Sequence, residues 1–338
     1  MRENFQPLSP LRDGFGRIHS YLRISITERC DLRCQYCMPP EGIQLQPRAH
    51  LLTLEEIERL ASLLVRLGVN KIRLTGGEPM VRRGVEQLVE RLGQLQVLES
   101  LGMTSNGILL SERLPQLIKA GLTHLNLSLD TWHPERFAQI TLRDQFLAVQ
   151  HCLSQALEAP LTSLKLNCVV MAGVNDDELF DFVAFTQDHA LEVRFIEYMP
   201  FSGNGWDTSK LFTYAQMRAR IAERFELVPV HTPRANETAS VFQVPGFKGR
   251  VGFITSMTDH FCATCNRLRL TADGNIKNCL FDNGELSLRD PMRAGADDAE
   301  LEKLIRLSIA RKHARHGGHS SPEAIALDPG RSMIQIGG

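Results

Sequence analysis

Residues 21–37 read YLRISITERCDLRCQYC and join a strand pattern to three closely spaced cysteines. Apolar and polar residues alternate through the start of this stretch, which predicts a β-strand with one apolar face. A helix pattern follows at residues 53–68, with Thr53 and Glu56 in a capping-box relation. It leads into a second strand pattern, KIRLT, at residues 71–75. This order predicts parallel strands with the helix packed outside.

The alternation of strand and helix patterns continues to about residue 200. Further strand patterns occupy residues 101–105, 123–129, 164–170 and 191–199, which gives six βα-type units in all. One face of these strands is apolar, whereas the other carries hydroxyls, amides and the cations Arg23, Arg73 and Lys165. A closed eight-stranded barrel is filled by branched apolar side chains, so a polar inner face indicates an open barrel around a large polar ligand. The alternative, solvent-exposed antiparallel strands, is disfavoured by the intervening helices.

The pattern changes after residue 200. A loop at 201–209 precedes helix patterns near 210–224 and 297–312, and strand patterns pair at 240–257. The segment RLRLTADGNIKNCLF, residues 267–281, reads as a hairpin around Asp273 and Gly274, whose two-residue turn would place Cys279 opposite Leu268.

We therefore expect an α/β fold. It is an open (incomplete) parallel β/α barrel of about six units with a C-terminal extension that carries a second cysteine cluster. Residues 1–200 would form the partial barrel, and residues 201–338 a region of β-hairpins with a metal site and a Gly-Gly tail.

Composition narrows the class of protein. The 338 residues carry a net charge of −1 and are 43% hydrophobic, which argues against a disordered chain and against a basic protein that coats nucleic acid. Apolar runs are too short for a membrane helix, and the first 17 residues are charged and lack the apolar core of a secretory leader. We expect a cytoplasmic protein without a membrane partner, in which disulfides are rare.

The first cysteine group is Cys30, Cys34 and Cys37, spaced C-x3-C-x2-C in the loop after the first strand. Three thiolates in one loop predict a metal cluster, and a cube of four irons held by three thiolates keeps one iron open for another ligand. Zinc prefers four ligands, and only the remote His50 could serve as the fourth. Unliganded thiols in a polar loop would oxidise readily.

The second cysteine group is Cys262, Cys265 and Cys279. His260 could complete a zinc site with these thiols, so spacing alone leaves iron and zinc at even odds. The other two cysteines, Cys152 and Cys168, alternate with apolar residues and are expected to pack in the core.

Both cysteine groups lie in segments that resemble a known family. The loop CDLRCQYC, with Tyr36 before its last cysteine, and TGGEP at 75–79 resemble the motifs of radical S-adenosylmethionine (SAM) enzymes. Within that superfamily, the segments YLRISITERCDLRCQYCMP, KIRLTGGEP, TSNG, NLSLD, LKLNCVVM, RFIEYMP, FCATCNRLRLTADGNIKNCLF and the final GG resemble the GTP 3′,8-cyclases of molybdenum-cofactor biosynthesis. One departure is Ser105 in TSNG, where that family has a second Thr.

The resemblance implies roles for individual residues. SAM would be contacted by Tyr36, Gly77, Ser128 and Met199. GTP would be contacted by Arg23, Arg73, Thr104, Lys165, Arg267, Leu268 and Arg269. The two cysteine groups would hold two 4Fe–4S clusters, and Gly337 and Gly338 would enter the active-site cavity. His313, His316 and His319 near the end are expected in a solvated basic segment.

The resemblance also implies the chemistry. Reductive cleavage of SAM would start removal of the C3′ hydrogen of GTP, and attack of C3′ on C8 would lead to a 3′,8-cyclo-7,8-dihydro product, a lyase reaction without a conventional acid or base. The partners implied are GTP, an electron donor, a downstream cyclic pyranopterin synthase and a second copy in a homodimer. The rival hypotheses are a radical SAM enzyme that modifies peptides and a non-catalytic zinc-binding module.

Overall fold

The computed structural model describes residues 8–230 and 238–337. Within them the strands form one 12-stranded sheet in the order β12-β11-β10-β1-β2-β3-β4-β5-β6-β9-β8-β7. The strands are β1 (Tyr21–Ser25), β2 (Lys71–Thr75), β3 (Ser100–Ser105), β4 (His124–Ser128), β5 (Ser163–Val170), β6 (Glu192–Glu197), β7 (Val228–Pro229), β8 (Ser240–Gln243), β9 (Arg250–Ile254), β10 (Arg267–Leu270), β11 (Asn275–Lys277) and β12 (Leu286–Ser287). From β10 through β1–β6 to β9 every neighbouring pair is parallel. Because the order has two ends, the barrel is open, which confirms the predicted fold class.

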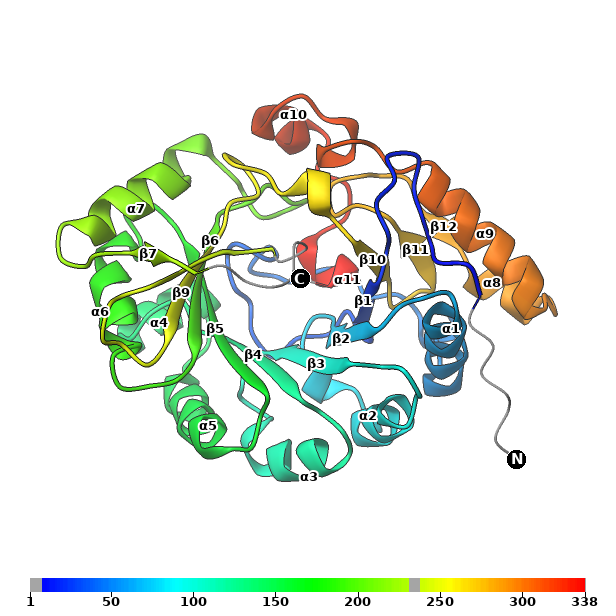
Figure 1. The fold of residues 1–338 in the computed structure, drawn as a ribbon, viewed down its shortest axis with the longest axis horizontal. Coiled ribbons are helices and arrows are strands. Elements are labelled where there is room, and N and C mark those ends of the chain that lie inside the picture. The colour runs from blue at the N-terminus through cyan, green and yellow to red at the C-terminus, as the bar shows by residue number, and fades with distance from the viewer. Residues whose placement is uncertain (1–7, 231–237, 338) are drawn as a thin grey trace.

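Helices cover the outside of this curved sheet, and the lumen is on the inside (Figure 1). The longer ones are α1 (Leu54–Arg66), α2 (Val85–Gly93), α3 (Leu114–Lys119), α4 (Pro134–Thr141), α5 (Phe146–Glu158), α6 (Leu179–Phe185), α7 (Tyr214–Ala222), α8 (Arg289–Arg293), α9 (Asp298–Ala310) and α10 (Pro322–Leu327). The short helix α11 (Met333–Ile336) differs from them, because it lies inside the ring of strands. Among the described residues, no helix is long and apolar enough to cross a membrane.

Local sequence explains the helices and the strand faces. The Thr53 hydroxyl accepts from the Glu56 amide while the Glu56 carboxylate accepts from the Thr53 amide, so the capping box that begins α1 is present. On β1, Leu22 and Ile24 are fully buried in the core between sheet and helices, and Arg23 between them faces the lumen. The polar inner face predicted from the alternation is confirmed.

Residues after 200 add strands to both edges of the six-stranded parallel sheet, and the barrel remains open. Strand β9 pairs with β6, and β10 pairs with β1. Each therefore extends the sheet formed by β1–β6 by one parallel strand. The predicted division at residue 200 falls between β6 and α7, and strands from both sides share one sheet.

The hairpin of β10 and β11 is present, but its predicted register is wrong by one residue. Arg269 lies opposite Lys277, so Leu268 is not in register with Cys279. The turn contains three residues, because the Thr271 amide donates to the Asn275 carbonyl (2.9 Å) and Gly274 takes a φ of 83°. The Thr271 hydroxyl accepts from the Asn275 amide at 2.9 Å, which stabilises this bulged turn.

Candidate active site

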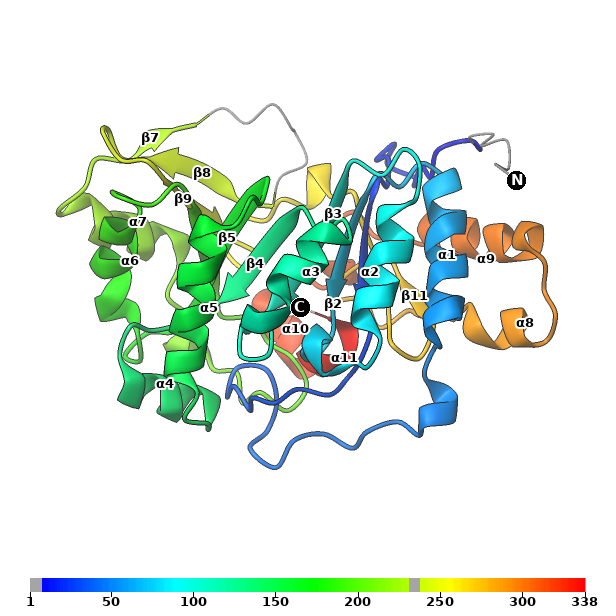
Figure 2. The ribbon, with the colours of Figure 1, turned by 90° about the horizontal axis from the view of Figure 1, so that it is seen from below.

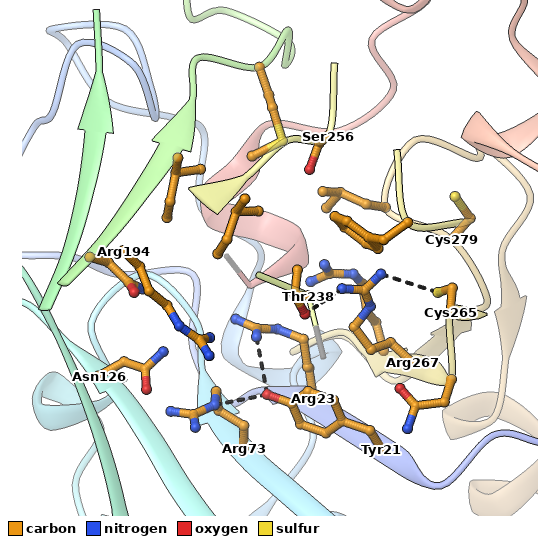
Figure 3. A pocket seen from close by; sticks show the side chains of 18 of the residues that line it. Tyr21, Arg23, Arg73, Asn126, Arg194, Thr238, Ser256, Cys265, Arg267 and Cys279 are labelled. Atoms are coloured by element: carbon orange, nitrogen blue, oxygen red, sulfur yellow. Dashed lines mark hydrogen bonds between the residues drawn. The ribbon is translucent and has the colours of Figure 1, made fainter. Parts of the chain in front are cut away.

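The lumen holds a cavity of about 400 Å³, a volume typical of small-ligand sites. Every strand of the parallel part of the sheet, including β3 through Ser100, contributes to its lining. The lining includes Tyr21, Arg23, Lys71, Arg73, Asn126, Lys165, Asn167, Arg194, Ile254, Arg267 and Arg269. Figure 3 shows the labelled arginines converging from several strands on one space.

Three arginines form a row across neighbouring strands. Arg269 on β10 is in register with Arg23 on β1, and Arg23 is in register with Arg73 on β2. Burial, together with the charges of Arg23 and Arg267, lowers the pKa of Arg269 to about 9. Buried like charges at this spacing repel one another, so an anion bound between them would be stabilised strongly.

The predicted substrate cations also have partners within the protein, as Arg73 and Lys165 illustrate. Arg73 Nε donates to the Tyr21 hydroxyl at 2.8 Å, and Arg73 donates to the Met103 carbonyl at 2.9 Å. Lys165 Nζ lies 3.5 Å from a Glu192 carboxylate oxygen. These contacts fix where the cationic groups point.

The first cysteine group lies in the loop that follows β1. Backbone hydrogen bonds join this loop to the glycines after β2: the Gly77 amide donates to the Thr27 carbonyl and the Glu78 amide to the Arg29 carbonyl, both at 2.8 Å. A Cβ atom on Gly77 would collide with the Arg29 carbonyl. Glycine is therefore needed at position 77 for contact with the cysteine loop.

The surroundings of the first group oppose bare thiolates. Burial raises the pKa of the Cys37 thiol to about 12, with Asp130 adding to the rise. Burial and nearby carboxylates also raise the pKa of Cys30 and Cys34. The Leu32 amide donates to Cys30 Sγ at 3.4 Å, a contact suited to a metal-bound sulfur. Ionised thiols here need positive charge, which iron would supply.

In the second cysteine group, Cys265 has cations beside its sulfur, whereas burial raises the pKa of Cys262. Arg267 donates to Cys265 Sγ at 3.3 Å and Lys312 Nζ donates to it at 3.4 Å. Although burial acts to raise the pKa of Cys265, these two cations lower it to about 6. This lowered pKa favours the thiolate form of Cys265, and Cys262, Cys265 and Cys279 all line the cavity.

The two groups lie at opposite ends of the lumen. The first follows the end of β1, in the blue loop at the bottom of Figure 2. Cys262 and Cys265 precede the start of β10, and Arg267 at that start is in register with Tyr21 at the start of β1. A ligand in the cavity between them can therefore approach both groups.

Neither group is arranged for a single ion. Among the residues that the structure describes, no set of three or more His, Cys, Asp or Glu side chains could hold one metal ion. A cube of four irons takes each thiolate on a different iron, so its ligands need not converge on one point. Three thiols in each group are the donor set that such a cube takes when its fourth iron stays open to an outside ligand.

The other predicted ligand residues fall into two sets. Tyr36 and Met199 line the cavity with the cations, whereas Gly77, Ser128, Thr104 and Leu268 are not among its lining residues. The Gly77 amide donates to the Thr27 carbonyl, so a contact of Gly77 with SAM would use its other backbone atoms. The side chain of Leu268 is fully buried in the core.

Thr104 Oγ1 and Asn167 Oδ1 are among the buried side-chain atoms of the described residues that lack a hydrogen-bond partner. Buried polar atoms are normally paired, so these oxygens mark places where a bound molecule would supply the partner. Asn167 lines the cavity, and sequence reasoning placed it on the polar face without choosing it as a ligand residue.

The C-terminal tail reaches the row of arginines. Arg269 donates to the Gly337 carbonyl at 2.6 Å, and a Cβ atom on Gly337 would collide with Thr75 Oγ1 at the end of β2. Ile334 and Ile336 are each 2% exposed and anchor the tail. Gly338 lies outside the described residues.

Other residues were missed or misassigned. Arg194 lines the cavity and pairs with Glu192, and its alternation with Val193 and Phe195 was the available signal. His316 is buried, with its ring Nε2 3.0 Å from the Ser256 carbonyl, so its expected place in a solvated segment is wrong. Cys152 and Cys168 are buried in the core, as predicted.

Comparison with known proteins gives the class first. Residues 24–186 match the family model of the Radical SAM superfamily, and residues 191–318 match that of Molybdenum Cofactor Synthesis C. The fold is similar to that of Streptococcus suis SuiB bound to S-adenosylmethionine, at 15% identity and a TM-score of 0.55, covering 94% of this chain and 74% of that one. The chain is a radical SAM protein, a class whose cofactors are SAM and an iron–sulfur cluster.

Relatives then give the particular family. The chain is 51% identical to "GTP 3',8-cyclase, mitochondrial" of Arabidopsis thaliana, covering 97% of this chain and 83% of that protein. It is 41% identical to "GTP 3',8-cyclase" of Moorella thermoacetica, covering 97% and 100%. The chain belongs to the GTP 3′,8-cyclase family. It is also 53% identical to "Molybdenum cofactor biosynthesis protein 1" of Bos taurus over 99% of its length, and spans 52% of that longer protein.

Proposed function

We propose that the chain is a radical SAM GTP 3′,8-cyclase, which converts GTP to (8S)-3′,8-cyclo-7,8-dihydroguanosine 5′-triphosphate in molybdenum-cofactor biosynthesis. The observation that carries the proposal is the row of Arg269, Arg23 and Arg73 in a cavity between two cysteine groups. A triphosphate is the kind of anion that so many buried cations bind.

The first cysteine group would hold a 4Fe–4S cluster beside SAM. Together they would supply a carbon radical that removes hydrogen from the ribose of the substrate. Tyr36 and Met199, at that end of the cavity lining, would contact SAM, as would Gly77 and Ser128 nearby. The chain would hold C3′ of GTP toward this end and keep other hydrogen donors away.

The second cysteine group would hold another 4Fe–4S cluster near the substrate. Arg267 reaches from Cys265 to the cavity, which suits a residue that contacts both cluster and GTP. Arg23, Arg73, Lys165 and Arg269 would bind the phosphates, Thr104 would supply a hydroxyl, and Leu268 would take part through its backbone. Gly337 and Gly338 would close the site beside the substrate.

Further parts of the proposal concern partners and place. An external electron donor would reduce the clusters, and a cyclic pyranopterin synthase would take the product. A homodimer and a cytoplasmic location remain predictions of the sequence. A peptide substrate, the rival within the superfamily, gives no reason for a buried arginine row, and a zinc module gives none for the cavity between the cysteine groups.

The test is a reaction under strict anaerobiosis with GTP, SAM and dithionite. We expect about eight irons per chain, consistent with two four-iron clusters, and a product of the same mass as GTP that requires SAM. ATP and UTP serve as controls for the base. Zinc without iron, or a reaction with peptides and none with GTP, would exclude the proposal.

A further inference from the structure

Lys312 is a buried cation that no step of the proposed reaction uses. It follows α9 and is 5% exposed. Its Nζ donates to Cys265 Sγ at 3.4 Å and to the Arg267 carbonyl at 3.3 Å. No carboxylate among the described residues forms an ion pair with it, and burying an ammonium group without a compensating charge is unfavourable.

The other cation on the same sulfur has a different setting. Arg267 lines the cavity and also donates to Thr238 at 2.8 Å, so it is open to a ligand there. Lys312 is not among the residues that line the cavity. The negative charge that faces Lys312 is therefore the sulfur itself, whatever the cavity holds.

The segment around Lys312 is fastened to the second cysteine group from outside the barrel. Arg17 donates to the Cys262 carbonyl at 2.8 Å, to the Ala314 carbonyl at 2.9 Å and to the His313 carbonyl at 2.8 Å. Asp13 holds Arg17 in place through an ion pair of 2.6 Å. Arg17 thus joins the backbone just after Lys312 to that of Cys262, which helps to hold the lysine in place.

We propose that Lys312 is a positioning residue that sets the reduction potential of the cluster on Cys262, Cys265 and Cys279. The inference rests on the proposed function, because it requires that cluster. A positive charge and a hydrogen bond at a ligating sulfur stabilise the reduced, more negative cluster, so they raise its potential. The first cysteine group lies beside carboxylates, so the two clusters would differ in ease of reduction.

The experiment is a redox titration of the holoenzyme followed by electron paramagnetic resonance. The reduction step of the second cluster is identified as the one that the titration of Cys265→Ala lacks. In Lys312→Met, the equilibrium constant for reducing this cluster should fall at least tenfold, which is about 59 mV for one electron. Lys312→Arg should stay within about twofold of wild type, and so should Lys303→Met, the control on an exposed part of α9.

If Lys312→Met loses the second cluster, its potential cannot be measured, so a second measurement is made on the wild type. Wild-type holoenzyme labelled with ¹⁵N-lysine should show a ¹⁵N coupling to the reduced second cluster, absent from Lys312→Arg. A full iron content with an unchanged potential in Lys312→Met, or no such coupling in wild type, overturns the inference while the cyclase proposal stands. Four irons in wild type would instead overturn the two-cluster proposal and this inference with it.

Discussion

Several positively charged side chains of the cavity are buried from solvent. Arg73 is 3% exposed and Arg269 is 8% exposed, and both lie in register with Arg23 between them. Such a row costs free energy while the cavity lacks an anion, and it gives that free energy back when an anion binds. The same residues would then distinguish a nucleoside triphosphate from a nucleoside.

Lys165 gives the cleanest test of this charge, since it is less enclosed than the arginines. Lys165→Met removes one charge-assisted hydrogen bond, which by general measure is worth roughly 1.5–3 kcal/mol. The dissociation constant for GTP, measured by equilibrium dialysis under anaerobiosis, should rise on the order of 10- to 100-fold. Binding of SAM should be unchanged, because Lys165 lies on β5 away from the cysteine loop.

Lys119→Met, an exposed change at the end of α3, is the matched control and should alter neither affinity. Equal loss of GTP and SAM binding in Lys165→Met would assign this lysine a structural role through Glu192 instead.

Among the elements, α11 is unusual because a helix of four residues stands inside a ring of strands. Its two isoleucines are buried, and the chain then turns at Gly337 with a φ of 73°. The arrangement leaves a backbone carbonyl on Arg269 where a side chain would not fit. The tail is therefore a fitted part of the cavity wall.

Gly337→Ala tests this fit. The added Cβ would collide with Thr75, so the tail must move and Arg269 must lose its partner. We expect iron content and SAM cleavage near wild type and cyclic product reduced at least tenfold. Product and methionine are measured together by liquid chromatography.

Gly173→Ala is the control, because it introduces the strain of a positive φ without the collision that an added Cβ makes at position 337. Gly173 has a similar φ of 71°, but a Cβ there meets nothing within 4 Å. It should keep wild-type product formation. If the two variants behaved alike, the position of the tail would not matter for cyclisation.

The elements differ in how far sequence could predict them. Alternation along β1 and β2 predicted which side chains enter the lumen, because strand periodicity is a local property. The sequence predicts a two-residue turn at Asp273 and Gly274, but the turn has three residues. The hydrogen bond to the Thr271 hydroxyl that stabilises it is not evident from the Asp-Gly pair alone. Burial of His316 depends on Ser256, far away along the chain, and has no local signal.

At the scale of the whole molecule, the pairing of β10 with β1 could not be predicted either. Hairpin patterns predicted β9 and β10, but these patterns do not indicate which strand of the barrel each one pairs with. The spacing of the cysteines predicted two groups and left their positions open. The sheet order then places one group at each end of the lumen.

This separation predicts that removing each group has a different effect. Cys34→Ala removes a thiolate from the group beside the Gly77 loop and should abolish SAM cleavage. Cys265→Ala should keep measurable SAM cleavage, because the first loop is untouched, and should lose the cyclic product. Each variant should hold about four irons, as expected for one remaining cube. Iron analysis and chromatography of both products make the measurement.

Cys152→Ala is the control, because this cysteine is fully buried in the core and belongs to neither cysteine group. It should keep all the iron and both products. Normal cyclisation by Cys265→Ala would show that the second group does not serve the reaction.

The pairing of β1 with β10 has a consequence during synthesis of the chain. Tyr21 is made long before Arg267, its neighbour in the sheet. Until then one side of β1 has no strand beside it, and an unpaired strand edge invites association with other chains. Contacts of such long sequence separation also form slowly. We expect the nascent chain to depend on chaperones until β10 has joined β1, and the proposed cluster site on Cys262, Cys265 and Cys279 to be filled late.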